Sequence, residues 1–144
     1  MAVEGEHPVQ TTRTTGEFTF ANWEEHTIGQ LEDGPKLAHA SVTNTFSGGM
    51  EAATTTCAYT IAYLTETTGT FTGLELVNGV LDGRKGSFVL EERGSFDAES
   101  SVHCTFEVVP GSGTDELTGL TGRGHFTTHQ GKPSTRYTFD YGHG

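Results

Sequence analysis

Glu75 and Glu92 are the residues of this sequence best placed to do chemistry, because an alternating pattern sets both on one face of a hairpin. They lie in two strand-like runs joined by Asp82-Gly83, and an Asp-Gly pair between such runs is typical of a tight turn. A two-residue turn would place Glu75 opposite Leu90, and a four-residue loop would place it opposite Glu92. Side chains alternate across a strand with a period of two, so in both registers one face holds Glu75, Val77, Phe88, Leu90 and Glu92.

Two carboxyl groups that share a site can perform acid–base chemistry, because like charges and a low dielectric raise the pKa of one of them. We therefore predict that Glu75 and Glu92 are catalytic, as a general acid or base or by stabilising positive charge, if this face looks into the protein. The alternative is a solvated face on which Arg84, Lys85 or Arg93 neutralises the acids.

Tyrosines in a neighbouring strand-like run could supply hydrogen bonds to a ligand. Tyr59 and Tyr63 share one face of this run with Cys57 and Ile61, and a buried phenol needs a polar partner. We predict Tyr63 as a catalytic hydrogen-bond donor, although packing in the core is an alternative for both tyrosines. The residues expected to bind a ligand are Glu51, near the mouth of a pocket, and Tyr59, Val77, Phe88 and Leu90.

Composition limits the classes of partner. A net charge of −11 and the lack of a Lys/Arg-rich run argue against nucleic acid and anionic membranes as partners. The first residues lack a signal-peptide pattern, so we expect a cytoplasmic protein in which Cys57 and Cys104 stay reduced and buried. No histidines have close metal-ligand spacing and no cofactor motif is present, so we expect neither a metal nor a cofactor.

The segmentation of the 144-residue chain predicts an all-β fold with no substantial helix. Residues 1–15 are polar and interrupted by Pro8, as is typical of a flexible arm, and residues 24–36 are acidic and broken by Gly and Pro, as in a loop. Residues 16–144 are expected to form one domain. Eight strand candidates with mostly short connections favour a single antiparallel eight-stranded β-barrel, with a β-sandwich as the alternative. The candidates are residues 17–23, 37–46, 53–64, 70–81, 85–93, 101–109, 124–128 and 135–141.

Four pieces of the sequence resemble the bacterial domain of unknown function 3224 (DUF3224). They are GPKLAHASVTNTFSGGMEA, IAYL, FTGLELVNGVLDGRKGSFVLEERGSF, and VVPGSGTDELTGLTGRG with the terminal YTFDY. The resemblance implies a closed barrel similar to that of allene oxide cyclase, with a pocket and an oligomeric state above one. Where the family often has Gln-His after GSFVL, this chain has Glu91-Glu92, so a family mechanism based on that His would not transfer.

Three functions fit these features. The first is a cofactor-free cyclase or isomerase that acts on a small, largely apolar organic molecule inside the barrel, working by positioning and a few charges. The second is a binding or carrier protein without turnover, and the third is a structural homo-oligomer, a dimer in the simplest case, with a filled barrel. A barrel of eight strands is wide enough either to be filled by its own side chains or to hold one small ligand.

Overall fold

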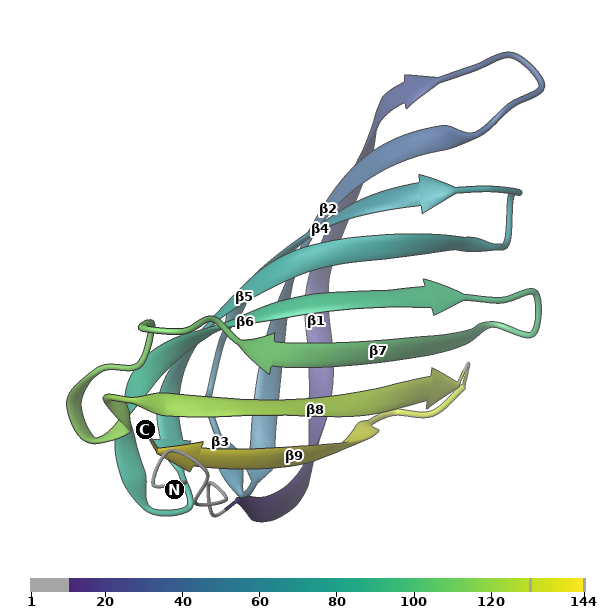
Figure 1. Ribbon diagram of the computed structural model, residues 1–144. Coiled ribbons are helices and arrows are strands. Elements are labelled where there is room, and N and C mark those ends of the chain that lie inside the picture. Colours follow the sequence, from purple (N-terminus) through teal and green to yellow (C-terminus); the bar gives the residue numbers. More distant parts are fainter. Residues whose placement is uncertain (1–10, 130, 144) are drawn as a thin grey trace, which may run out of the picture.

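The computed structural model describes residues 11–129 and 131–143, and most of them belong to one antiparallel sheet (Figure 1). The strands are β1 (Thr12–Gln30), β2 (Lys36–Gly48), β3 (Met50–Glu51), β4 (Thr56–Tyr63), β5 (Gly69–Leu81), β6 (Arg84–Phe96), β7 (Ser101–Val108), β8 (Leu120–His129) and β9 (Thr135–His143). Their order in the sheet is β3-β5-β4-β2-β1-β9-β8-β7-β6, and β5 also pairs with β6.

The β5–β6 pairing closes eight strands into a ring, and the two-residue strand β3 pairs with the end of β5. The described residues contain no α-helix; the short 3-10 helix η2 (Asp115–Leu117) packs Leu117 into the core. No helix in this part of the chain is long and apolar enough to cross a membrane. The predicted all-β fold with eight closed antiparallel strands is confirmed.

The β5–β6 hairpin adopts the register of a two-residue turn. Asp82 and Gly83 both have positive φ, 46° and 88°, which matches the turn that best continues the twist of a hairpin. Leu81 therefore pairs with Arg84, and Glu75 with Leu90. Asp82 is held from two sides, because its carboxylate accepts hydrogen bonds from Tyr141 Oη at 2.5 Å and Thr14 Oγ1 at 3.1 Å.

Alternate residues of each strand point into the ring and fill it with two apolar clusters. The larger cluster lies toward the Asp82-Gly83 turn and includes Phe88, Phe139 and Tyr137, all buried. The smaller cluster, around Ile61 and Phe71, lies toward the other ends of the same strands. Glu75 and Glu92 are buried between these clusters, so the face that they share looks into the protein.

On one side of the ring the β1–β2 hairpin continues past the strands that pair with it at its base, and this end of the ring is called the open half. Strand β1 pairs with β9 only over Thr12–Phe18, and from Thr19 to Gln30 it pairs with β2 alone. In Figure 1 this part of the β1–β2 hairpin rises away from β8 and β9. Phe20 and Trp23 lie there with 66% and 46% of their surface exposed, so part of the aromatic interior is accessible to solvent.

The expected arm and the expected loop at residues 24–36 both differ from the structure in β1. Residues 1–10 of the expected flexible arm at 1–15 lie outside the described residues, but Thr12–Thr15 form backbone pairs with β9. Residues 24–30 of the expected loop are also strand, because backbone pairing with β2 does not require a buried face. Two register shifts, between Ala21 and Glu24 and between Thr27 and Gly29, absorb the irregular sequence there.

Candidate functional site

The centre of the site is a pair of buried carboxyl groups, Glu75 on β5 and Glu92 on β6. Their exposed fractions are 2% and 1%, which is unusual because carboxylates are seldom fully buried without a partner. Among the described residues no lysine, arginine or histidine lies within ion-pair distance of either group. The alternative, a solvated face on which Arg84, Lys85 or Arg93 neutralises the acids, is therefore not what the structure has.

Glu75 is held by two donors on the side away from Glu92's strand. Its Oε2 accepts hydrogen bonds from Asn44 Nδ2 at 2.8 Å and from Thr55 Oγ1 at 2.5 Å. The Thr55 hydroxyl in turn accepts from the backbone N–H of Asn44. Two donors on one oxygen therefore fix the orientation of the Glu75 carboxyl group in the interior.

Glu92 is the member of the pair that favours a proton. Burial raises its pKa well above the usual value, and the neighbouring Glu75 adds to this by hydrogen bonding and by charge repulsion. Hydrogen bonds from Tyr59 and Cys104 oppose the shift but do not cancel it. A carboxyl group with a raised pKa beside a second carboxyl group is an arrangement from which acid–base chemistry can start.

Tyr59 connects the carboxyl pair to the open half of the ring. Its hydroxyl donates to Glu92 Oε1 at 2.8 Å, while its ring packs edge-on against Phe71 and lies 6.3 Å from the ring of Trp23. Burial and the charge of Glu92 raise the pKa of Tyr59 well above its usual value. Tyr59 thus remains a neutral donor that spans from Glu92 to the solvent-accessible aromatic surface.

A glycine makes the contact between Tyr59 and Glu92 possible. In the cross-strand register Tyr59 on β4, Gly73 on β5 and Glu92 on β6 form one row, so the tyrosine ring has to cross the middle strand. A Cβ atom at Gly73 would collide with the carbonyl oxygen of Ala58 and would lie 2.5 Å from Cδ1 of Tyr59. The site therefore requires a residue without a side chain at position 73.

Two buried thiols flank the pair. Cys104 Sγ lies 3.7 Å from Glu92 Oε1, and Cys57 Sγ lies within 4.8 Å of a carboxyl oxygen of both Glu75 and Glu92. Burial raises the pKa of both thiols, and the charge of Glu92 raises it further. A thiolate and two carboxylates form a ligand set that Zn²⁺ accepts, but each thiol here favours its protonated form.

The structure separates two predicted site residues from the pair. Tyr63 lies on the interior face of β4 as predicted, but its hydroxyl donates to Glu25 Oε2 at 2.6 Å near the rim. Burial and this hydrogen bond raise the pKa of Tyr63 to about 12. Glu51 is exposed on the short strand β3, next to β5 near the Asp82-Gly83 turn.

The remaining predicted ligand-binding residues lie beneath the pair. Val77, Phe88 and Leu90 are each 1% exposed and belong to the larger apolar cluster. They form the packed base of the site rather than an accessible wall. Tyr59 alone among the predicted residues reaches from the pair toward solvent.

Sequence reasoning missed the residues that hold Glu75 and those at the rim. Asn44 interrupts an alternating apolar row of β2, after Ala40 and Val42 and before Phe46; a polar side chain at such a position could have signalled a buried hydrogen bond. Thr55 precedes β4 and carries no comparable signal. Glu25 falls in the acidic segment 24–36, whose composition is typical of a loop.

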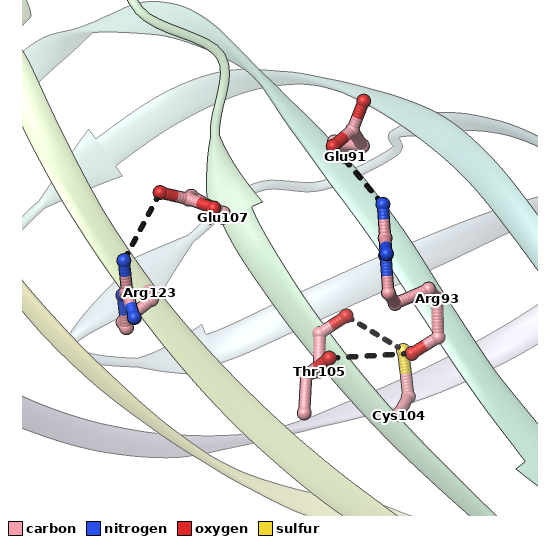
Figure 2. Close-up of polar contacts among 6 residues, drawn as sticks. All are labelled: Glu91, Arg93, Cys104, Thr105, Glu107 and Arg123. Atoms are coloured by element: carbon pink, nitrogen blue, oxygen red, sulfur yellow. Dashed lines mark hydrogen bonds and ion pairs between the residues drawn. The ribbon is translucent and has the colours of Figure 1, made fainter.

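The outer face of the sheet carries two shallow grooves. One of about 550 Å³ lies over Gly94 and the other, of about 470 Å³, over Gly73. The groove over Gly94 is lined by exposed Arg93 and His103 and also by buried Phe71 and Cys104. The groove over Gly73 is lined by exposed Glu91 and Arg93 and also by Tyr59 and buried Glu92. Figure 2 shows this face, where Arg93 pairs with Glu91 at 3.9 Å and Arg123 with Glu107 at 3.3 Å. The guanidinium groups of Arg93 and Arg123 on this face are thus already close to carboxylates.

Comparison with known proteins gives the family. A search of curated proteins returns no match. Among solved structures, the chain is similar to a protein of unknown function from the DUF3224 family of Shewanella oneidensis MR-1, with 28% identity and a TM-score of 0.74 over 94% of this chain and 99% of that one. The family model of DUF3224, a protein of unknown function, matches residues 14–141. The chain therefore belongs to the DUF3224 family.

Proposed function

We propose that this protein binds a small, largely apolar organic molecule against the aromatic interior of its open half. In this proposal the Glu75–Glu92 pair exchanges a proton with the ligand through Tyr59, in a cofactor-free isomerisation or ring closure. The observation that carries the proposal is the Tyr59 hydroxyl, which contacts Glu92 at one end of a ring that borders the accessible aromatic surface.

The proposed chemistry conserves the composition of the substrate. Tyr59 would accept a proton from the ligand while its own proton passes to the pair, and the reverse transfer at a second ligand atom would complete the isomerisation. The raised pKa of Tyr59 means that the two transfers at its oxygen must be concerted, because a free phenolate is costly there. The proposed reaction consumes no oxidant, reductant or group donor.

A binding protein without turnover is the second candidate function. The observation in its favour is the depth of the pair, because Glu75 and Glu92 are almost fully buried beneath Tyr59. A ligand in the open half would then contact aromatic side chains and no carboxyl group of the pair. The apolar clusters would serve only to support the binding surface.

A ligand screen followed by two variants tests the proposal. Trp23 is the only tryptophan of the chain, so its fluorescence reports directly on the open half. We expect hydrophobic ligands to shift its emission, and we expect Tyr59→Phe and Glu75→Gln to retain binding but lose conversion of the ligand as followed by NMR. Binding without conversion in the unmodified protein supports the carrier, and a screen in which no molecule shifts Trp23 emission overturns both.

We also propose a cytoplasmic location. Cys57 and Cys104 are both free and both lie near Glu92, and thiols at such a position persist in a reducing compartment. Fractionation of the native host, with detection of the protein in each fraction, tests this part of the proposal.

A further inference from the structure

We infer that the ligand of the open half carries an organic ammonium group, which the Glu25 carboxylate and the rings of Trp23 and Tyr63 recognise. The inference rests on the proposed binding function and names the chemical class of its ligand. A neutral apolar molecule would need only the aromatic surface, whereas this surface is built around a fixed negative charge.

The Glu25 carboxylate is oriented by the two aromatic side chains beside it. Its Oε1 accepts a hydrogen bond from Trp23 Nε1 at 3.1 Å, and its Oε2 accepts one from the Tyr63 hydroxyl at 2.6 Å. A carboxylate has about four lone-pair positions, so each oxygen keeps the capacity to accept from a cation. Glu25 pairs with Ala40 of β2, whose small, buried side chain leaves the space above it to these groups.

The backbone of β1 is irregular next to Trp23, whose side chain lies at this surface. Asn22 has a positive φ of 60°, and the register with β2 shifts between Ala21 and Glu24. Trp23 consequently lies against Tyr59 on the interior side, with nearly half of its surface exposed. A bulge that aims one side chain is a common device beside functional sites.

A cation of the protein already occupies part of this surface. Lys36 Nζ lies 4.4 Å from the ring centroid of Tyr63, within the range of a cation–π contact. Lys36 pairs in register with Gln30 and Tyr63 and is the one basic residue on the interior face of this half among the described residues. The ammonium of Lys36 therefore shows which chemistry the ring face of Tyr63 accepts, beside the carboxylate that accepts from its hydroxyl.

The charges of the surroundings favour the same class of ligand. The chain carries a net charge of −11, so its field attracts cations. The interior acidic groups nearest to the open half are Glu25 at the rim and the buried Glu75–Glu92 pair, and Lys36 is the one basic group there. The ring of Phe96 lies 5.3 Å from that of Tyr63. An ammonium ion with apolar substituents would satisfy the rim carboxylate while its apolar part packs on Trp23, Tyr59 and Phe96.

A matched pair of probes tests the inference. Benzyltrimethylammonium and neopentylbenzene have the same shape. The first has a positively charged quaternary nitrogen where the second has a neutral quaternary carbon. We expect the cation to bind about tenfold more tightly, as a cation–π and carboxylate contact predicts, measured by Trp23 fluorescence and by the shift of its indole N–H resonance. Equal affinity for the two probes overturns the inference while leaving the proposed binding function intact.

Three variants of the full chain locate the contact. Glu25→Gln should weaken binding of the cation about tenfold and leave neopentylbenzene unaffected, and Lys36→Met should strengthen cation binding by removing the internal competitor. Glu24→Gln is the matched control, because Glu24 is exposed and pairs with the exposed Ser41 on the outer face. Equal weakening by the two Glu→Gln variants would indicate only a long-range effect of net charge and would overturn the assigned site. If neither probe affects Trp23, the inference and the proposed function both fail.

Discussion

The hydroxyl of Tyr59 donates to Glu92 Oε1 at 2.8 Å across an intervening strand. The contact exists because Gly73 stands between the two residues in the cross-strand row and has no side chain to block the ring. One row of the sheet thus links the accessible half of the ring to a buried pair of carboxyl groups.

Gly73→Ala should break this link. The added methyl would meet the backbone of Ala58 and the ring of Tyr59, and overpacking of this kind costs about 1–3 kcal/mol of unfolding free energy. Urea denaturation measures the loss. Gly29→Ala is the control, because nothing lies within 4 Å of a Cβ atom at Gly29; equal stability of the two variants would contradict the role given to Gly73.

The position of the carboxyl pair could be predicted from the sequence because it depends on local rules. The Asp82-Gly83 turn and the period of two place Glu75 and Glu92 on one face in either register, and the apolar neighbours of that face turn it inward. Tyr63 illustrates the limit of the same rules. It shares a face with Tyr59, but four residues of strand separate them by about 13 Å, so only tertiary structure decides which of them meets Glu92.

The rim of the site could not be predicted because β1 has an unusual environment. Over residues 19–30 this strand has one backbone partner, and its side chains are exposed on both faces. Acidic residues and glycines are tolerated there, so the composition resembles that of a loop. Glu25 therefore lies in a segment that alternation and hydrophobicity do not identify as a strand, and Trp23 lies at the last residue of the expected strand 17–23.

The contribution of Glu92 to the free energy of unfolding should fall as the pH rises above about 4.5. Folding raises the pKa of Glu92 above its ordinary value of 4.5, so the folded state retains a proton that the unfolded state has lost. This stabilising contribution is complete below the pKa that Glu92 has in the unfolded chain. It is lost as the pH rises through the pKa that Glu92 has in the folded protein. Urea denaturation across this range should show a smaller decline for Glu92→Gln than for the unmodified protein. Glu91→Gln, on the exposed face, should keep the original slope; identical slopes for all three proteins would refute the raised pKa of Glu92.

Thr55→Val should destabilise the protein through Glu75. The variant removes the hydroxyl that donates to Glu75 Oε2 and accepts from the backbone of Asn44, and loss of such buried hydrogen bonds costs about 1–3 kcal/mol. Thr56→Val, at the next and exposed position, should change the unfolding free energy little. In a double-mutant cycle Glu75→Gln should reduce the cost of Thr55→Val, since the hydroxyl then donates to an uncharged oxygen. Additive costs would show that Thr55 acts independently of Glu75.

Cys57 and Cys104 should be unreactive in the folded protein. Both thiols are buried, and burial together with the charge of Glu92 raises their pKa, so the thiolate that reacts with disulfide reagents is scarce. Titration with a coloured aromatic disulfide should release no signal from native protein and the signal of two thiols in strong denaturant. Glu92→Gln should leave the native thiols unreactive, because desolvation remains the larger cause of their raised pKa. Rapid labelling of either thiol under native conditions would mean that the site between the two apolar clusters opens to solvent without unfolding.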